Sequence, residues 1–239
     1  MDVKTANLQQ SVKQRLLNIS KQRKEDFQFC LTRYALERFL YRLSESRFVD
    51  RFILKGALLL MAWSAQPYRP TKDLDLMGPG EPAPEVLKEI IAEICQTDVI
   101  ADGLFFDIAS IAISEIREDQ EYQGQRIRLS ASLGKARVFL QIDVAFGDVI
   151  TPGIKMINFP TLLDMPPARI QACSKETVVA EKLQAAVHLG MQNIRMKDLY
   201  YLIWLSRSFS FNGALLVEAI QATFKRTKTE LPSYVPLFL

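Results

Sequence analysis

Hydrophobic positions recur at two different periods along this chain of 239 residues. Over residues 8–45 the apolar side chains of Phe27, Leu31, Tyr34 and Phe39 fall at helical spacing, with neither glycine nor proline, which predicts one long helix. Helical patterns are also predicted later in the chain, over residues 56–63, 84–96, 174–190, 195–207 and 212–224.

Between these helical patterns the period changes to two, which is typical of strands. Strands are expected over Phe105–Ile113, Arg126–Ser132 and Ala136–Ala145, and Gly134-Lys135 is expected to form the hairpin turn between the last two. The order of helices, mixed elements and then helices predicts an α+β protein whose mixed sheet is flanked by helices. Residues 147–167 are rich in Gly and Pro, which predicts a boundary between a domain 1–150 and a helical domain 151–239.

Composition and charge narrow the class of protein without naming a function. The net charge of +3 does not by itself indicate nucleic-acid binding, but residues 1–42 hold nine Lys or Arg against four Asp or Glu. The three cysteines are odd in number and far apart, which argues against a disulfide framework or a zinc site. No apolar run approaches the length of a membrane span and the N-terminus has no signal core, so a cytoplasmic protein is expected.

The most informative chemistry lies in the segment Asp73-Leu74-Asp75, which follows the Pro-containing loop before it. In an extended segment two residues two apart point to the same side, so both carboxylates would share one face while Leu74 and Leu76 point into a core. Paired carboxylates are the oxygen ligands that Mg²⁺ prefers, and Mg²⁺ bridges to substrate phosphates. An isolated Asp-x-Asp is more often a solvated strand edge or a helix cap than a metal site.

Two further residues strengthen the interpretation. Asp143 lies on the polar face of an otherwise apolar strand, so it is the candidate third carboxylate. It would act either as a ligand beside two Mg²⁺ ions held by Asp73 and Asp75 or as a proton acceptor. Gly56, just upstream, would let the backbone approach a triphosphate. This order of residues predicts phosphoryl or nucleotidyl transfer from an NTP.

The C-terminal helices offer a second polar group. Lys182 lies in Glu176–Gln184 beside apolar helical neighbours, so it either extends its charged end to solvent or directs it at a phosphate. Asp198 is either an ordinary acidic residue at the start of a helix or the partner of Lys182 or Lys197.

Taken together, these residues resemble the AbiEii/AbiGii-type toxin nucleotidyltransferases, a family to which the MenT toxins are related. The resemblance runs from about Tyr34 to Pro232 and is carried by several motifs in order: Tyr34–Leu43, Leu54–Leu58, Arg69–Leu76, Ile142–Val144, Glu176–Lys182, Arg195–Asp198 and Ala222–Arg226. It implies an N-terminal nucleotidyltransferase lobe carrying the catalytic and metal-binding Asp73, Asp75 and Asp143. It also implies a helical C-terminal lobe carrying the catalytic Lys182 and Asp198.

The resemblance further implies what such a protein binds and modifies. Nucleotide binding would fall to Lys55, Gly56, Ala57, Arg195 and Lys197. The reaction would be Mg²⁺-dependent transfer of a nucleotide from NTP to an RNA acceptor, the 3′ end of tRNA, which blocks translation. A cognate antitoxin protein would counteract it. The pattern does not specify the NTP, the tRNA or the oligomeric state.

Three departures from the family pattern leave other readings open. Ala57 stands where many relatives have Gly or Ser, Tyr201 stands where many have a second Asp, and the chain ends at Leu239, which predicts a shortened helical lobe. One alternative is a nucleotidyltransferase that modifies a protein hydroxyl or a small molecule such as an aminoglycoside. The other is a catalytically degenerate module that binds NTP or a partner protein.

Overall fold

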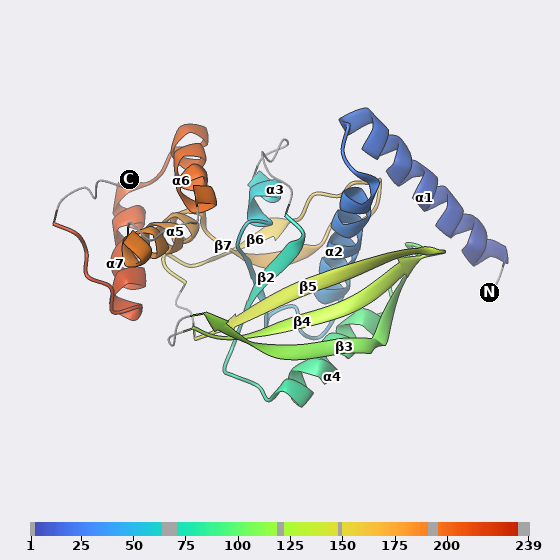
Figure 1. Cartoon of the computed structure of the whole chain (residues 1–239), viewed down its shortest axis with the longest axis horizontal. Helices are drawn as coiled ribbons and strands as arrows, with labels where there is room; N and C mark the ends of the chain where they lie inside the picture. Colours follow the sequence, from blue (N-terminus) through green and yellow to red (C-terminus); the bar gives the residue numbers. More distant parts are fainter. Residues whose placement is uncertain (1–2, 64–70, 119–121, 148–149, 191–195, 234–239) are drawn as a thin grey trace. The chain divides into compact units, whose positions relative to one another are not determined.

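The computed structural model describes residues 3–63, 71–118, 122–147, 150–190 and 196–233 (Figure 1). The chain forms two compact units: unit 1 comprises Met1–Gly147 and Met156–Ala172, and unit 2 comprises Asp148–Lys155 and Cys173–Leu239. The chain therefore leaves unit 1 after Gly147, returns to it at Met156 and passes into unit 2 again at Cys173. The division into functional domains 1–150 and 151–239 stays a prediction.

The helices of unit 1 begin with a break that the hydrophobic pattern did not reveal. The single helix expected over residues 8–45 is two helices, α1 (Val3–Arg23) and α2 (Phe27–Glu45). Lys24 has a positive φ of 53°, and the Asp26 side chain caps α2 by accepting a hydrogen bond from the Phe29 N–H at 3.0 Å. Two further helices follow, α3 (Leu59–Trp63) and α4 (Pro84–Gln96).

Seven strands form one mixed sheet in the order β3-β4-β5-β2-β1-β7-β6. Their bounds are β1 (Ile53–Lys55), β2 (Asp73–Gly78), β3 (Leu104–Glu118), β4 (Tyr122–Leu133), β5 (Ala136–Phe146), β6 (Ile154–Asn158) and β7 (Arg169–Cys173). β2 pairs in parallel with β5 and antiparallel with β1, while β1 pairs in parallel with β7. The expected α+β class with a mixed sheet is confirmed.

The hairpin between β4 and β5 forms as predicted, with Gly134 at φ 60° in its two-residue turn. The Gly- and Pro-rich stretch 147–167 is not only a connection, because it contains β6, and β7 follows at once. Sequence pattern missed both strands because each is only five residues long and lies next to turn-forming residues.

One face of the sheet is apolar and buried. Ile127, Ile142 and Leu74 are neighbours across β4, β5 and β2 and are fully buried, as are the β2 and β5 residues Leu76 and Val144. Helices α2 and α4 lie along this side of the long strands in Figure 1. Because side chains alternate along a strand, the intervening residues of β2, β4 and β5 must lie on the opposite face.

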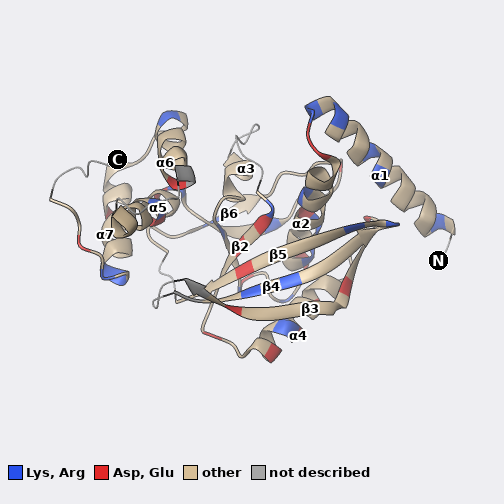
Figure 2. Ribbon diagram, in the orientation of Figure 1, with Lys and Arg blue, Asp and Glu red and all other residues tan. Residues whose placement is uncertain are grey.

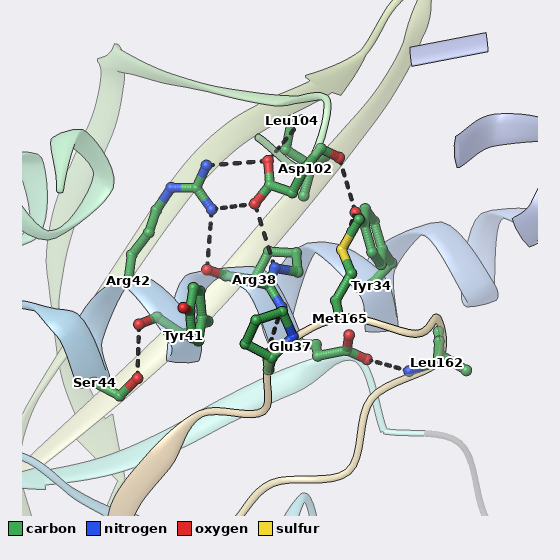
Figure 3. A network of polar contacts seen from close by, with 11 residues as sticks. Tyr34, Glu37, Arg38, Tyr41, Arg42, Ser44, Asp102, Leu104, Leu162 and Met165 are labelled. Atoms are coloured by element: carbon green, nitrogen blue, oxygen red, sulfur yellow. Dashed lines mark hydrogen bonds and ion pairs between the residues drawn. The ribbon is translucent and has the colours of Figure 1, made fainter. Parts of the chain in front are cut away.

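A buried network of charges ties α2 to two loops of unit 1 (Figure 3). The Asp102 carboxylate, which is 1% exposed, accepts hydrogen bonds from Arg42 at 2.6 and 3.2 Å and from Arg38 at 3.3 Å. Arg38 also donates to the Pro166 carbonyl at 2.9 Å, and the Tyr34 hydroxyl donates to the Asp102 carbonyl at 2.8 Å. Part of the basic excess of residues 1–42 is therefore internal and cannot track a phosphate backbone.

Glu37 belongs to the same side of α2 and is 1% exposed. Its Oε2 accepts a hydrogen bond from the Leu162 N–H at 2.8 Å. Burial away from water disfavours the charged form and raises the pKa of Glu37 from its ordinary 4.5 to about 7, against the opposing effects of the Leu162 hydrogen bond and of Arg38 and Arg33. This carboxyl therefore titrates near neutral pH in the folded protein.

Unit 2 is helical in its C-terminal part, as predicted, with α5 (Lys175–Leu189), α6 (Met196–Ser208) and α7 (Gly213–Arg226). Ser174 caps α5 by accepting from the Thr177 N–H at 3.1 Å, and Asn212 caps α7 by accepting from the Leu215 N–H at 3.2 Å. Helix α5 packs against both α6 and α7. Within the described ranges, no helix has the length and apolar character needed to cross a membrane.

Replacing Glu37 should change how stability depends on pH. Because its pKa is raised on folding, the carboxyl stabilises the fold fully below about pH 4.5, and this contribution is lost as pH rises through about 7. We expect Glu37→Gln to gain stability relative to wild type between about pH 5 and pH 8, on the order of 2–3 kcal/mol. Chemical denaturation at both pH values measures this difference.

The matched control is Glu45→Gln, because Glu45 lies on the same helix and is exposed. Its stability difference from wild type should stay the same at both pH values. A Glu37→Gln difference equally insensitive to pH would contradict the assignment.

Candidate functional site

Strand β2 presents the two aspartates of the Asp-x-Asp segment on one face of the sheet. Asp73 is exposed and Asp75 half-buried, whereas Leu74 and Leu76 are 0% and 1% exposed. The alternation predicted from the sequence is therefore confirmed. Apolar burial of the two leucines fixes the direction in which both carboxylates point.

The strand register places a row of four charged residues across this polar face. Asp75 on β2 lies opposite Asp143 on β5, Asp143 lies opposite Arg126 on β4, and Asp75 lies opposite Lys55 on β1. We call Lys55, Asp75, Asp143 and Arg126 the charged row. Two carboxylates lie at its centre with one cationic residue at each end, so the repulsion between the carboxylates is offset from both sides.

Arg126 holds the third predicted carboxylate in a defined orientation. Its Nε and Nη2 each donate to one oxygen of Asp143 at 2.8 Å, a bidentate ion pair. Gln141, also on β5, donates to Asp143 Oδ2 at 3.3 Å. The sequence interpretation missed Arg126. Register could have found it, because a two-residue turn at Gly134-Lys135 pairs Leu133 with Ala136 and hence Arg126 with Asp143.

Gly56 is required by the packing of Asp75. Gly56 has φ +72°, and a Cβ added there would lie 2.7 Å from the Asp75 carboxyl carbon and 2.8 Å from its Cβ. Only glycine combines this backbone conformation with such a close approach. The sequence interpretation assigned Gly56 to the approach of a triphosphate. The structure shows that the Asp75 side chain is its immediate neighbour, with Lys55 and Ala57 on either side.

The donor set on this face suits a hard divalent cation. Asp73, Asp75 and Asp143 offer carboxylate oxygens from adjacent positions of two paired strands, the type of ligand that Mg²⁺ prefers. In the part of the chain that the structure describes, however, no three His, Cys, Asp or Glu side chains come close enough to form a metal-binding group. Arg126 engages both oxygens of Asp143 in this conformation.

The predicted polar residues of unit 2 form a separate pair. Lys182 on α5 donates to Asp198 on α6 at 2.8 Å, which decides between the two roles considered for Asp198. The Lys182 ammonium also lies 4.7 Å from the centre of the Tyr201 ring, a cation–π contact. Tyr201, which departs from the family pattern, thus supports the lysine from one helical turn beyond Asp198.

Two other predicted nucleotide-binding residues are not placed in detail. Arg195 lies outside the described residues, as does Arg69 of the segment before β2. Lys197 lies within α6, where only its backbone is described. Their predicted roles stay predictions.

Comparisons with known proteins identify the kind of chain that carries this face. A family model described as "Nucleotidyl transferase AbiEii toxin, Type IV TA system" matches residues 38–238. Among solved structures, JHP933 from Helicobacter pylori is similar at 14% identity and a TM-score of 0.46, over 72% of this chain and 66% of its own. An H. pylori protein provisionally assigned as a nucleotidyltransferase is similar at 15% identity and a TM-score of 0.47, over 80% of this chain and 74% of its own.

This chain therefore spans about two thirds of the length of JHP933. The comparison with curated proteins yields no match.

Comparing alanine substitutions at Gly56 and Gly80 should separate the cost of backbone strain from the cost of the Asp75 contact. Gly56→Ala must adopt a positive φ and also displace the Asp75 carboxylate. Gly80→Ala shares the positive φ of +65° but meets nothing within 4 Å. We expect Gly80→Ala to cost about 1 kcal/mol and Gly56→Ala to cost about 1–3 kcal/mol more. Equal unfolding free energies for the two variants would show that the Asp75 contact does not matter.

A double-mutant cycle should measure the coupling between Arg126 and Asp143. Their side chains are 30% and 17% exposed, so solvent screening reduces the value of an otherwise strong bidentate pair. From Arg126→Gln, Asp143→Asn and the double variant we expect a coupling free energy of about 1 kcal/mol, with Arg126→Gln less stable than wild type. Additive effects in denaturant unfolding would mean that the pair is not formed in solution.

Proposed function

Since the chain belongs to the AbiEii family of nucleotidyltransferase toxins from type IV toxin–antitoxin systems, we propose that it transfers a nucleotide from NTP to an RNA hydroxyl. The proposed acceptor is the 3′ end of tRNA in the cytoplasm, where modification would block aminoacylation and translation. A cognate antitoxin protein would restrain the activity.

The observation that carries this proposal is the charged row on the open face of the sheet. Asp73, Asp75 and Asp143 lie at adjacent positions of β2 and β5, and the apolar residues between them are buried. A structural role alone does not favour adjacent carboxylates, because like charges repel across a strand pair. Their arrangement is understandable if a cationic group binds there during function.

Asp73 and Asp75 would hold Mg²⁺, with Asp143 beside them. When bound, Mg²⁺ would neutralise triphosphate charge and stabilise the charge that develops in the transition state. Gly56 leaves room for the Asp75 carboxylate, because a side chain at position 56 would clash with it. Arg126 orients Asp143 by binding both of its oxygens.

The bond changes follow those of nucleotidyl transfer. The acceptor hydroxyl oxygen bonds to the α-phosphorus, the bond from that phosphorus to the bridging oxygen breaks, and pyrophosphate leaves. The hydroxyl proton passes to solvent water as the new bond forms. Asp143, already an acceptor of hydrogen bonds from Arg126 at 2.8 Å, is better suited to positioning than to removing this proton. The catalytic roles predicted for Lys182 and Asp198 remain predictions that the same assay tests.

The proposal predicts transfer of label from NTP to RNA. The purified protein, incubated with Mg²⁺, each labelled NTP in turn and total tRNA, should yield labelled tRNA. Asp75→Asn should reduce the rate by at least roughly a hundredfold, because it removes a charge that acts on the transition state. Lys182→Met should lower the rate as well if Lys182 binds phosphate.

Asp98→Asn is the matched control, because Asp98 is an exposed aspartate of unit 1 that follows α4 and lies outside the strands of the sheet. It should transfer label at the wild-type rate. Absence of label on RNA with all four NTPs would overturn the proposal. Label on a protein or on an aminoglycoside, with RNA unlabelled, would support the alternative acceptors.

A further inference from the structure

The polar face of the sheet extends well beyond the carboxylates. Register across β3, β4 and β5 places further residues in line with the charged row on the same side. In successive rungs these are Ser114 beside Arg126; Ala112, Arg128 and Gln141; Asp107, Ser130 and Phe139; and Phe105, Ser132 and Arg137. We call the last three rungs, from Ala112 to Arg137, the open platform. It lies entirely within unit 1.

Two aromatic rings stand exposed on the open platform. Phe139 on β5 is 76% exposed and Phe105 at the start of β3 is 63% exposed. Their direct neighbours on β4 are Ser130 and Ser132, whose short side chains leave the faces of the rings uncovered. Exposed aromatic rings at neighbouring rungs of one sheet face are typical of a binding surface.

The platform also carries basic side chains at spacings that suit a phosphate backbone. Arg128 and Arg137 are exposed, and they lie one rung to either side of Phe139. Figure 2 shows basic positions along β4 and at the far end of β5, and acidic positions on β2 and β5 nearer the charged row. Phe139 and Asp143 are four residues apart on β5, or about 13 Å along the strand.

The combination of features points to one kind of ligand. Single-stranded nucleic acid binds to sheet surfaces by stacking bases on aromatic rings while arginines contact the phosphates. Protein interfaces also favour aromatic and Arg side chains, but the fully buried core of such an interface is mostly apolar. Apart from the two phenyl rings and Ala112, however, the three rungs of the platform are polar.

We propose that the open platform binds the single-stranded end of the acceptor RNA, with bases stacked on Phe139 and Phe105 and phosphates bound by Arg128 and Arg137. The strand then leads along β4 and β5 toward Asp143 and Asp75. This inference rests on the proposed function in taking the acceptor to be RNA. It adds the surface that holds the RNA, which the catalytic carboxylates do not specify.

Direct binding of RNA tests the platform without requiring catalysis. Fluorescence anisotropy of a labelled single-stranded oligoribonucleotide, without NTP, measures the Kd for the full chain. Phe139→Ala and Phe105→Ala should each weaken binding roughly 5- to 100-fold, the range found for loss of base stacking. Phe139→Tyr should retain near wild-type affinity. Ile100→Ala is the matched control, because Ile100 is 62% exposed in unit 1 and lies outside the strands.

Salt dependence tests the arginines independently. Arg128→Gln and Arg137→Gln should each reduce the slope of log Kd against log salt by about 0.7, the value for one phosphate contact with a single strand. Phe139→Ala should leave this slope unchanged. Thermal melting of each variant shows whether the fold is intact. A folded Phe139→Ala variant with unchanged RNA affinity would overturn the proposal.

The outcomes separate this inference from the proposed function. If Phe139→Ala binds RNA as wild type does while wild type still labels tRNA, the RNA-binding proposal is wrong and the proposed activity is supported. If RNA binding depends on both phenyl rings but no label is transferred, the RNA-binding proposal is supported and the proposed activity is wrong. If Phe139→Ala loses only the binding of a cognate antitoxin protein, the face is a protein interface and the RNA proposal is wrong.

Discussion

The parallel pairing of β2 with β5 is the constraint on which the site depends, because it sets Asp75 directly opposite Asp143. Like charges at directly paired positions of neighbouring strands repel each other. Sheet formation imposes this repulsion, since Leu74, Leu76, Ile142 and Val144 must all be buried on the other face. The bidentate pair between Arg126 and Asp143 offsets part of the repulsion, and the register adds Lys55 at the other end of the row. Burial of the apolar face therefore determines which charged residues become neighbours on the polar face.

The buried network around Asp102 joins helix α2 to segments next to the same sheet. Arg38 and Arg42 on α2 bind Asp102, which lies just before β3, and Arg38 reaches the Pro166 carbonyl in the segment before β7. Helix α2 packs against β5 and is thereby tied to segments that lead into two other strands of the sheet. Removing one partner from such a buried group is costly, because the remaining charge has no access to water. The network explains why Arg38 and Arg42 of α2 are internal although the sequence suggested a basic surface.

Local patterns predicted most of the individual helices and strands. Pairing between distant segments determined which of their residues lie side by side. Alternation of Asp73, Leu74 and Asp75 predicted a shared face, and the Gly134-Lys135 turn predicted a register that implies the Arg126–Asp143 pair. No local signal could show that β2 lies beside β5, because the two strands are about 70 residues apart and the pairing is parallel. The same holds for Gly56, whose requirement for glycine comes from Asp75 on another strand. The pairing of Lys182 with Asp198 was one of two alternatives that only the packing of α5 on α6 could decide. The roles of Arg195 and Lys197 still rest on the family resemblance alone.

The central claim is that Asp73 and Asp75, on the polar face of β2, bind the metal of an NTP complex. Electron paramagnetic resonance of Mn²⁺, titrated with a non-hydrolysable NTP analogue and the full chain, measures this binding without any acceptor. The account predicts a bound Mn²⁺ signal that requires the analogue, that is lost in both Asp73→Asn and Asp75→Asn, and that persists in Asp98→Asn. A signal of equal strength in the folded Asp75→Asn variant would contradict the account, because the metal would then bind elsewhere.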